Sequence, residues 1–114
     1  MMAHVTEVLD QTIALLQHPE TRWVNRIPIV HTNELCLVTA MANVMENYGH
    51  DPRLYQKVCN ALWREMSAMP PRWTPGGLPM QAISLSDFND SCTSLDQVIT
   101  LLQKAKDPCQ LITH

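Results

Sequence analysis

The residue with the most reactive chemistry in the sequence is Cys36, at the start of an apolar segment predicted to be helical. A helix N-terminus favours the thiolate form of cysteine, which is the nucleophile. His31 lies five residues upstream and would serve as the base, with Asp87, Asn89 or Asp90 orienting its imidazole. The sequence neighbours of Cys36 are apolar, however, and a free cysteine among apolar residues is more often a small buried side chain. We therefore predict no catalytic residue and regard a cysteine-dependent enzyme centred on Cys36 as an alternative.

Residues 88–91, Phe-Asn-Asp-Ser, have two interpretations of the same kind. Asp87 or Asp90 could act as an acid or base. Asn and Asp side chains also close Asx-turns, which free the backbone to start a new helix. We expect a structural turn here, anchored in the core by Phe88.

The Cys and His residues are poorly spaced for binding a metal. Structural zinc sites take their ligands from short Cys and His pairs. Here His31 with Cys36, and His50 with Cys59, are loose pairs, and none of the four cysteines forms a Cys-x-x-Cys motif. The sequence therefore predicts reduced thiols, no metal and no other cofactor.

A polar stripe in the segment 52–68 resembles a nucleic-acid-binding surface. The segment follows a predicted helix and a short turn, which together have the length of a helix-turn-helix. The net charge of −3, the lack of a basic arm, and Glu65 beside the stripe all weigh against DNA. A helix-turn-helix protein is therefore an alternative, whose contact residues would be Arg53, Gln56, Lys57, Asn60 and Arg64.

The Pro-rich stretch at 70–92 is the candidate contact surface for another protein. A long loop of this kind in a small domain usually serves a function or a partner. Trp and Arg are enriched at the centres of protein interfaces. The predicted partner-binding residues are Arg72, Trp73 and Met80.

Four helices are predicted to position these residues, at about 4–18, 34–48, 52–68 and 94–106. Apolar residues recur at helical spacing in the first, third and last segments. The second is apolar on most of its sides, so we expect it at the centre of the molecule.

Local signals mark the ends of these helices. Thr32 or Asn33 is the expected cap of the second helix, and Gly49 suits the left-handed residue that follows its end. Asp51 followed by Pro52 is a typical helix start. The last helix is expected to begin with a capping box, either Ser94–Gln97 or Thr93–Asp96, and to stop before Pro108.

The segments between the helices are less regular. Residues 23–30 surround Pro28, which blocks a helix and permits a short edge strand. Trp23 should pack onto the core. The segment 82–88 fits either a short strand or a helical turn, and the sequence does not decide between them.

Composition limits the class of protein. The chain has 114 residues and a mass of 13.0 kDa, with 46% hydrophobic residues, 3 Gly and 8 Pro. These values predict one globular domain, residues 1–114, that is poor in glycine turns and therefore in β-structure. The first ten residues lack the basic region of a secretion signal, and the longest apolar stretch, 35–45, is too short for a bilayer. We expect a cytoplasmic protein.

Several short motifs suggest a relationship. A first helix and a Trp precede Cys-Leu-Val-Thr-Ala-Met at 36–41, and Phe-Asn-Asp at 88–90 precedes a final helix that closes with Leu102 to Ala105. The chain resembles a small family of uncharacterised proteins from actinobacteria and their phages. Members show Cys-Leu-x-Gly-Ala-Leu and Trp-Asn-Asp, so Thr39 and Phe88 depart from the pattern. The resemblance implies a phage or actinobacterial origin, and a host cytoplasm if the protein is phage-encoded, but no activity.

The sequence as a whole thus predicts an all-α domain with a bundle of four main helices. We expect a non-enzymatic module that binds another protein, such as a host factor, or a second copy of itself.

Overall fold

The described part of the chain folds as a mainly helical molecule in two layers. The structure, a computed structural model, describes residues 2–68 and 84–112, with side chains at 4–68 and 84–106. Its elements are α1 (Met2–Gln17), β1 (Arg22–Trp23), β2 (Glu34–Leu35), α2 (Leu37–Met45), the 3-10 helix η1 (Glu46–Tyr48), α3 (Pro52–Ser67), α4 (Leu85–Ser91) and α5 (Leu95–Ile112). The prediction of an all-α protein is thus confirmed in outline, although a simple bundle of four helices is not what forms.

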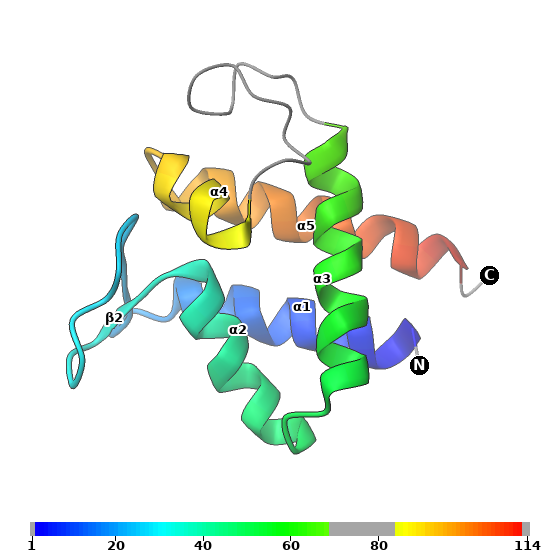
Figure 1. Ribbon diagram of the computed structural model, residues 1–114, viewed down its shortest axis with the longest axis horizontal. Coiled ribbons are helices and arrows are strands. Elements are labelled where there is room, and N and C mark those ends of the chain that lie inside the picture. The colour runs from blue at the N-terminus through cyan, green and yellow to red at the C-terminus, as the bar shows by residue number, and fades with distance from the viewer. Residues whose placement is uncertain (1, 69–83, 113–114) are drawn as a thin grey trace.

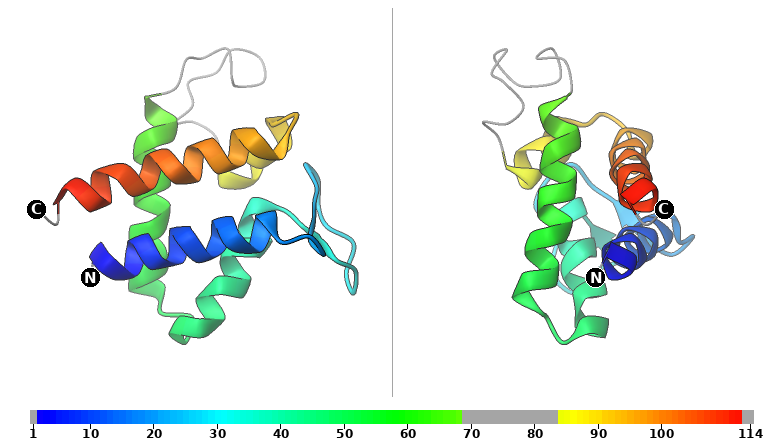
Figure 2. Two further views of the ribbon diagram at one scale, coloured as in Figure 1. Left: turned by 180° about the vertical axis from the view of Figure 1, so that it is seen from behind. Right: turned by 90° about the vertical axis from the view of Figure 1, so that its right-hand side faces the viewer.

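The two layers pack face to face around one core. Helices α1 and α5 lie side by side and run in opposite directions, while α2, α3 and α4 form the other layer (Figures 1 and 2). Helix α1 contacts α5, α2 and α3, so the central position belongs to α1. The predicted central role of the second helix is wrong, because its residues Ala42 and Asn43 are exposed to solvent.

Helices α1 and α3 follow their local sequence signals closely. In α1, Val5, Val8, Leu9 and Leu16 are each at most 1% exposed, which confirms the predicted apolar stripe. Helix α3 begins where Asp51 and Pro52 predict: the Asp51 carboxylate accepts the Arg53 N–H at 2.9 Å. Gly49 closes the preceding turn with a φ of 64°, a left-handed conformation that glycine adopts without strain.

The second helix starts later than predicted. Residues 34 and 35 form strand β2, which pairs in parallel with β1 in the register Arg22↔Glu34 and Trp23↔Leu35. Neither Thr32 nor Asn33 caps the helix. Cys36 is its N-cap residue, and the Cys36 N–H donates to Thr39 Oγ1 at 2.9 Å. The error has a physical cause: pairing with a strand distant in sequence outweighs the helical preference of an apolar run.

The predicted loop at 70–92 contains a short helix. Ser84 caps α4: its hydroxyl accepts the Asp87 N–H at 3.1 Å, and the Asp87 carboxylate accepts the Ser84 N–H at 3.3 Å. The alternatives left open for 82–88 are therefore decided from Leu85 onward in favour of a helix. The predicted Asx-turn at 88–91 is wrong, because these residues lie inside α4. Phe88 is 1% exposed, as expected of a core anchor.

Helix α5 is longer than the segment 94–106 predicted for it. It runs through Pro108 to Ile112, so the predicted stop before Pro108 is wrong. Lys106 of this helix forms an ion pair with Asp10 of α1. Within the described residues, no helix has both the length and the apolar character needed to cross a bilayer.

Candidate functional site

A single buried amide joins three elements that are far apart in the sequence. Asn89 of α4 has no exposed surface. Its Oδ1 accepts the indole N–H of Trp23 at 2.8 Å and the backbone N–H of Leu37 at 3.0 Å. Its Nδ2 donates to the Val24 carbonyl at 3.1 Å and to Asp90 Oδ1 at 3.3 Å. The amide thus uses its full capacity of two donated and two accepted hydrogen bonds.

These contacts fix the base of a loop formed by residues 24–33, which connects β1 to β2 and projects from one side of the molecule (Figure 1). Asn25 Nδ2 donates to the Cys92 carbonyl at 3.0 Å, and Asn33 Nδ2 donates to the Glu20 carbonyl at 2.8 Å. The base of loop 24–33 is therefore tied to α4 and to the chain that follows α1.

A bidentate ion pair between the loop and β2 organises the loop backbone. Arg26 donates from Nη1 and Nη2 to the two carboxylate oxygens of Glu34 at 2.8 and 2.6 Å. Glu34 Oε1 also accepts the Ile29 N–H at 3.0 Å, and Arg26 Nη1 donates to the Ile27 carbonyl at 3.1 Å. Thr32 Oγ1 donates to the Ile29 carbonyl at 2.6 Å. The loop is held in one shape by its own polar groups.

This braced loop carries three aliphatic side chains into solvent. Within the described residues, the exposed large hydrophobic side chains are Ile27 at 86%, Ile29 at 58% and Val30 at 76%, and we call these three the apolar tip. Single exposed apolar residues need no explanation, but three large ones within positions 27–30 are unusual enough to require one. The sequence predicted an extended connection or one short edge strand in this segment, and not an exposed tip. The feature of the sequence that marked this segment was Pro28 among β-branched residues that do not alternate with polar ones.

The ion pair also shifts the titration of its carboxylate. The pKa of Glu34 falls to about 2, first because Arg26 hydrogen-bonds its charged form and next because the Ile29 N–H does the same. The bidentate geometry is the strong form of such a contact.

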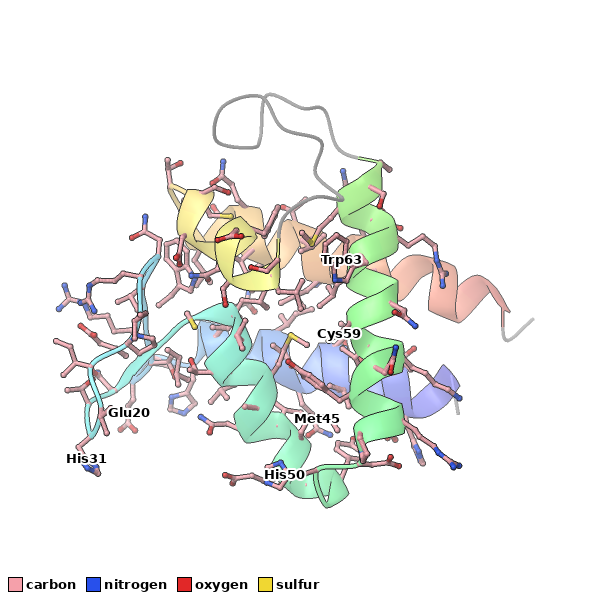
Figure 3. All side chains as sticks on the ribbon, in the orientation of Figure 1. Glu20, His31, Met45, His50, Cys59 and Trp63 are labelled. Atoms are coloured by element: carbon pink, nitrogen blue, oxygen red, sulfur yellow. The ribbon has the colours of Figure 1, made fainter. Side chains whose placement is uncertain are left out.

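The structure does not bring together the residues of the thiol hypothesis. Cys36 is 8% exposed, and its backbone and sulfur face Thr39. His31 is exposed at the far end of loop 24–33, away from the start of α2 (Figure 3). Asp87 caps α4 and Asn89 is fully engaged, so neither is free to orient an imidazole.

The polar stripe predicted on the third helix does lie on one face of α3. Its members are exposed or, for Lys57, partly exposed, and they are opposite the buried side made by Leu54, Val58 and Leu62. Neither of the two ion pairs seen in the described residues involves the stripe. The stripe residues are Arg53, Gln56, Lys57, Asn60 and Arg64.

Comparison with known proteins gives a family. The sequence model of DUF6197, a family of unknown function, matches residues 2–108. The chain belongs to this family. No curated protein and no solved structure matches it. Membership in DUF6197 confirms the resemblance to an uncharacterised family and assigns the protein no activity.

A pocket of about 270 Å³, which we call the corner pocket, lies between α2 and α3 and is lined by Ala42, Met45, His50, Pro52 and Tyr55. Among the described residues, no group of three or more His, Cys, Asp or Glu side chains is placed to hold a metal ion. The predicted contact residues Arg72, Trp73 and Met80 lie outside the described residues.

Replacing Asn89 with Ala should destabilise the protein strongly. The variant leaves the Trp23 indole N–H, the Leu37 N–H and the Val24 carbonyl without their partner, at about 1–3 kcal/mol for each buried group. We expect the free energy of unfolding in urea to fall by about 3–5 kcal/mol. Ser91→Ala is the control, because it removes one partly buried hydrogen bond from the same helix. Equal losses in the two variants would contradict the role of Asn89.

The depressed pKa of Glu34 predicts how the loop responds to acid. Because the folded-state pKa, about 2, lies below the ordinary value of 4.5, the ion pair stabilises the loop fully above pH 4.5. That contribution is lost as the pH falls from 4.5 through about 2. NMR titration of the Glu34 carboxyl carbon and the Ile29 amide should both show the low midpoint. Glu34→Gln should remove this low-pH transition from the signal of the Ile29 amide. A titration midpoint of Glu34 near pH 4.5 would disprove the ion pair in solution.

Proposed function

We propose that this DUF6197 protein is a non-enzymatic interaction module that binds another protein chain through the apolar tip of loop 24–33. The supporting observation is that Ile27, Ile29 and Val30 are exposed on a loop that its own hydrogen bonds hold rigid. A flexible loop would lower its free energy by folding such side chains onto the body of the protein. A braced loop keeps them available and loses little conformational entropy on binding.

The loop also limits how it can bind. Pro28 has no N–H, the Ile29 N–H and carbonyl are both bonded inside the loop, and the Ile27 carbonyl accepts from Arg26. These engaged groups and the missing donor of Pro28 interrupt the backbone edge with which a partner strand would pair, so strand addition is disfavoured. The tip therefore binds through its side chains, and its partner must offer an apolar concave surface.

Two earlier expectations extend this proposal. Arg72, Trp73 and Met80 stay the predicted contact residues of the Pro-rich segment. The phage or actinobacterial origin implied by the resemblance also stays a prediction, and under it a host protein is an expected partner.

A photocrosslinking experiment in cells that naturally contain the protein tests the apolar tip. Benzoylphenylalanine in place of Ile27 should give a discrete covalent adduct with a protein chain, because the tip lies inside an interface. The same amino acid in place of Gln103, which is exposed on α5, is the control and should give none.

A second substitution shows whether the adduct depends on the tip. Val30→Asp, added to the Ile27 probe, should abolish the adduct with little change in the melting temperature, because an exposed side chain contributes little to stability. The absence of an adduct at position 27, or an adduct insensitive to Val30→Asp, would refute the proposal.

Nucleic acid binding by α3 is a second candidate function, favoured by the placement of its five polar residues on one exposed face. Three of them, Arg53, Lys57 and Arg64, carry positive charge. If the face contacts phosphates, the logarithm of the affinity for duplex DNA should fall with the logarithm of salt concentration with a slope of about −3.

Fluorescence anisotropy with a labelled duplex measures this slope. Arg53→Glu and Arg64→Glu should each weaken binding and reduce the slope by about 1, whereas Lys104→Glu on α5 should not. No binding at about 50 mM salt would eliminate this candidate.

A further inference from the structure

We propose that a second pocket, at the base of loop 24–33, binds an alkylammonium group, which is a positively charged amine on an aliphatic stem. This pocket, which we call the loop-base pocket, has a volume of about 390 Å³ and lies where the end of α1, the end of the loop, β2 and α2 meet. Cavities of about 150 Å³ already admit benzene, so the pocket has room for a short aliphatic chain. Unlike the mainly apolar corner pocket, it is lined mostly by polar side chains.

The polar side chains of the loop-base pocket are largely free to receive a ligand. Within the described residues, the side chains of Glu20, Thr21 and Asn43 form no hydrogen bond and no ion pair. Asn33 Nδ2 donates to the Glu20 carbonyl, which leaves Asn33 Oδ1 as a free acceptor. The carboxylate and the two amide oxygens are acceptors, and an ammonium group offers three donors and no acceptor.

The charge of the pocket favours a cation. Among the described residues that line it, Glu20 alone carries a full charge, because His18 is neutral in this arrangement. His18 Nδ1 accepts the Glu20 N–H at 3.1 Å, so that nitrogen carries no proton. The pocket also lies at the last turn of α1, the negative end of the helix dipole, and that turn contains no basic residue. An anion would meet no positively charged side chain in this lining.

The nearby arginine, Arg22, belongs to the other face of the two-stranded sheet. Thr21 and Arg22 are consecutive residues of an extended segment, so their side chains point to opposite faces. Thr21 lines the pocket, whereas Arg22 is paired in register with Glu34, whose charge attracts it. Neither of the two ion pairs in the described residues joins Arg22 to Glu20. The Glu20 carboxylate therefore remains available to a bound cation.

The aliphatic stem of the ligand also has a matching surface. Leu15 of α1 and Leu35 of β2 line the pocket and are partly buried. Side chains such as lysine pack their methylene groups on apolar surface and keep the charged end in a polar environment. Free amines and a lysine side chain of another chain share this chemistry. Figure 3 shows Glu20 on the side of the molecule from which loop 24–33 projects, and its side chain is exposed, so either ligand could reach it.

Titration of the full chain with n-butylamine, followed by NMR at about pH 8, tests the inference; the ligand is then charged and His18 is neutral. We expect saturable shifts of the backbone amides of Glu20, Asn33 and Asn43, with a dissociation constant in the millimolar range because the site is exposed. The control ligands, n-butanol and butyrate, are of similar size without the positive charge and should bind more weakly. Tighter binding of Nα-acetyl-lysine amide than of n-butylamine would assign the site to a lysine side chain, and the reverse to a free amine.

Two substitutions with opposite effects show whether charge decides the binding. Glu20→Gln should weaken n-butylamine binding about three- to fivefold, the size expected of an exposed ion pair. Asn43→Asp adds a carboxylate and should strengthen binding by a similar factor. Both side chains are exposed and without a partner, so both variants should keep the wild-type melting temperature. Glu65→Gln on α3, a helix that contributes nothing to this lining, is the control and should bind as the wild type does.

Three results would each overturn the inference: n-butanol or butyrate binding as tightly as n-butylamine, binding indifferent to Glu20→Gln, or no saturable shift at any concentration. None of them affects the proposed function, because the apolar tip and the loop-base pocket consist of different residues. Val30→Asp should abolish the adduct at position 27 and leave n-butylamine binding unchanged. The two proposals can therefore fail independently.

Discussion

The hydrogen bonds of Asn89 are the constraint on which the arrangement of the described elements most depends. Residues 23, 37 and 89 belong to three separate elements, and one buried amide fixes all three. The contact with the Leu37 N–H satisfies a donor at the start of α2, where the helix itself offers no acceptor. The contacts with Trp23 and Val24 hold β1 against α4 and so set the position of loop 24–33. Each bonded group is buried or partly buried. Losing the amide would therefore leave several of these polar groups without a hydrogen-bond partner at once.

The sequence predicted the elements whose causes are local. The start of α3 depends only on the adjacent residues Asp51 and Pro52. The buried face of α1 can likewise be predicted from the spacing of apolar residues within that segment alone. Glu34 and Leu35 look helical in the same kind of analysis, because they begin an apolar run. They form a strand because Arg22 and Trp23 approach from elsewhere, and the Val24 N–H reaches the Leu35 carbonyl at 3.0 Å. Periodicity within one segment contains no information about such a partner.

The candidate site was harder to predict than the fold, for the same reason. Asn89 looked like a turn residue, since the preference of Asn for turns is local, whereas its partners Trp23, Val24 and Leu37 lie 52 to 66 positions away. Arg26 and Glu34 are eight positions apart in an irregular segment, and no repeat links them. Without that pair, Ile27, Ile29 and Val30 look only like part of an extended connection or a short edge strand around Pro28. The stripe on α3 could be predicted, because the spacing of its residues on a helix is enough to place them on one face.

The hydrogen bonds that hold loop 24–33 limit the ways in which it could bind a partner. An exposed apolar segment with free backbone groups pairs with any extended chain and is an aggregation hazard. Here Pro28 lacks a donor, and the polar backbone groups of Ile29 are occupied by Glu34 and Thr32. The ion pair that holds the loop is weak as an isolated surface contact, but it closes a short loop and satisfies two backbone groups at the same time. In the interaction that we propose, the tip would therefore contact its partner mainly through the side chains of Ile27, Ile29 and Val30.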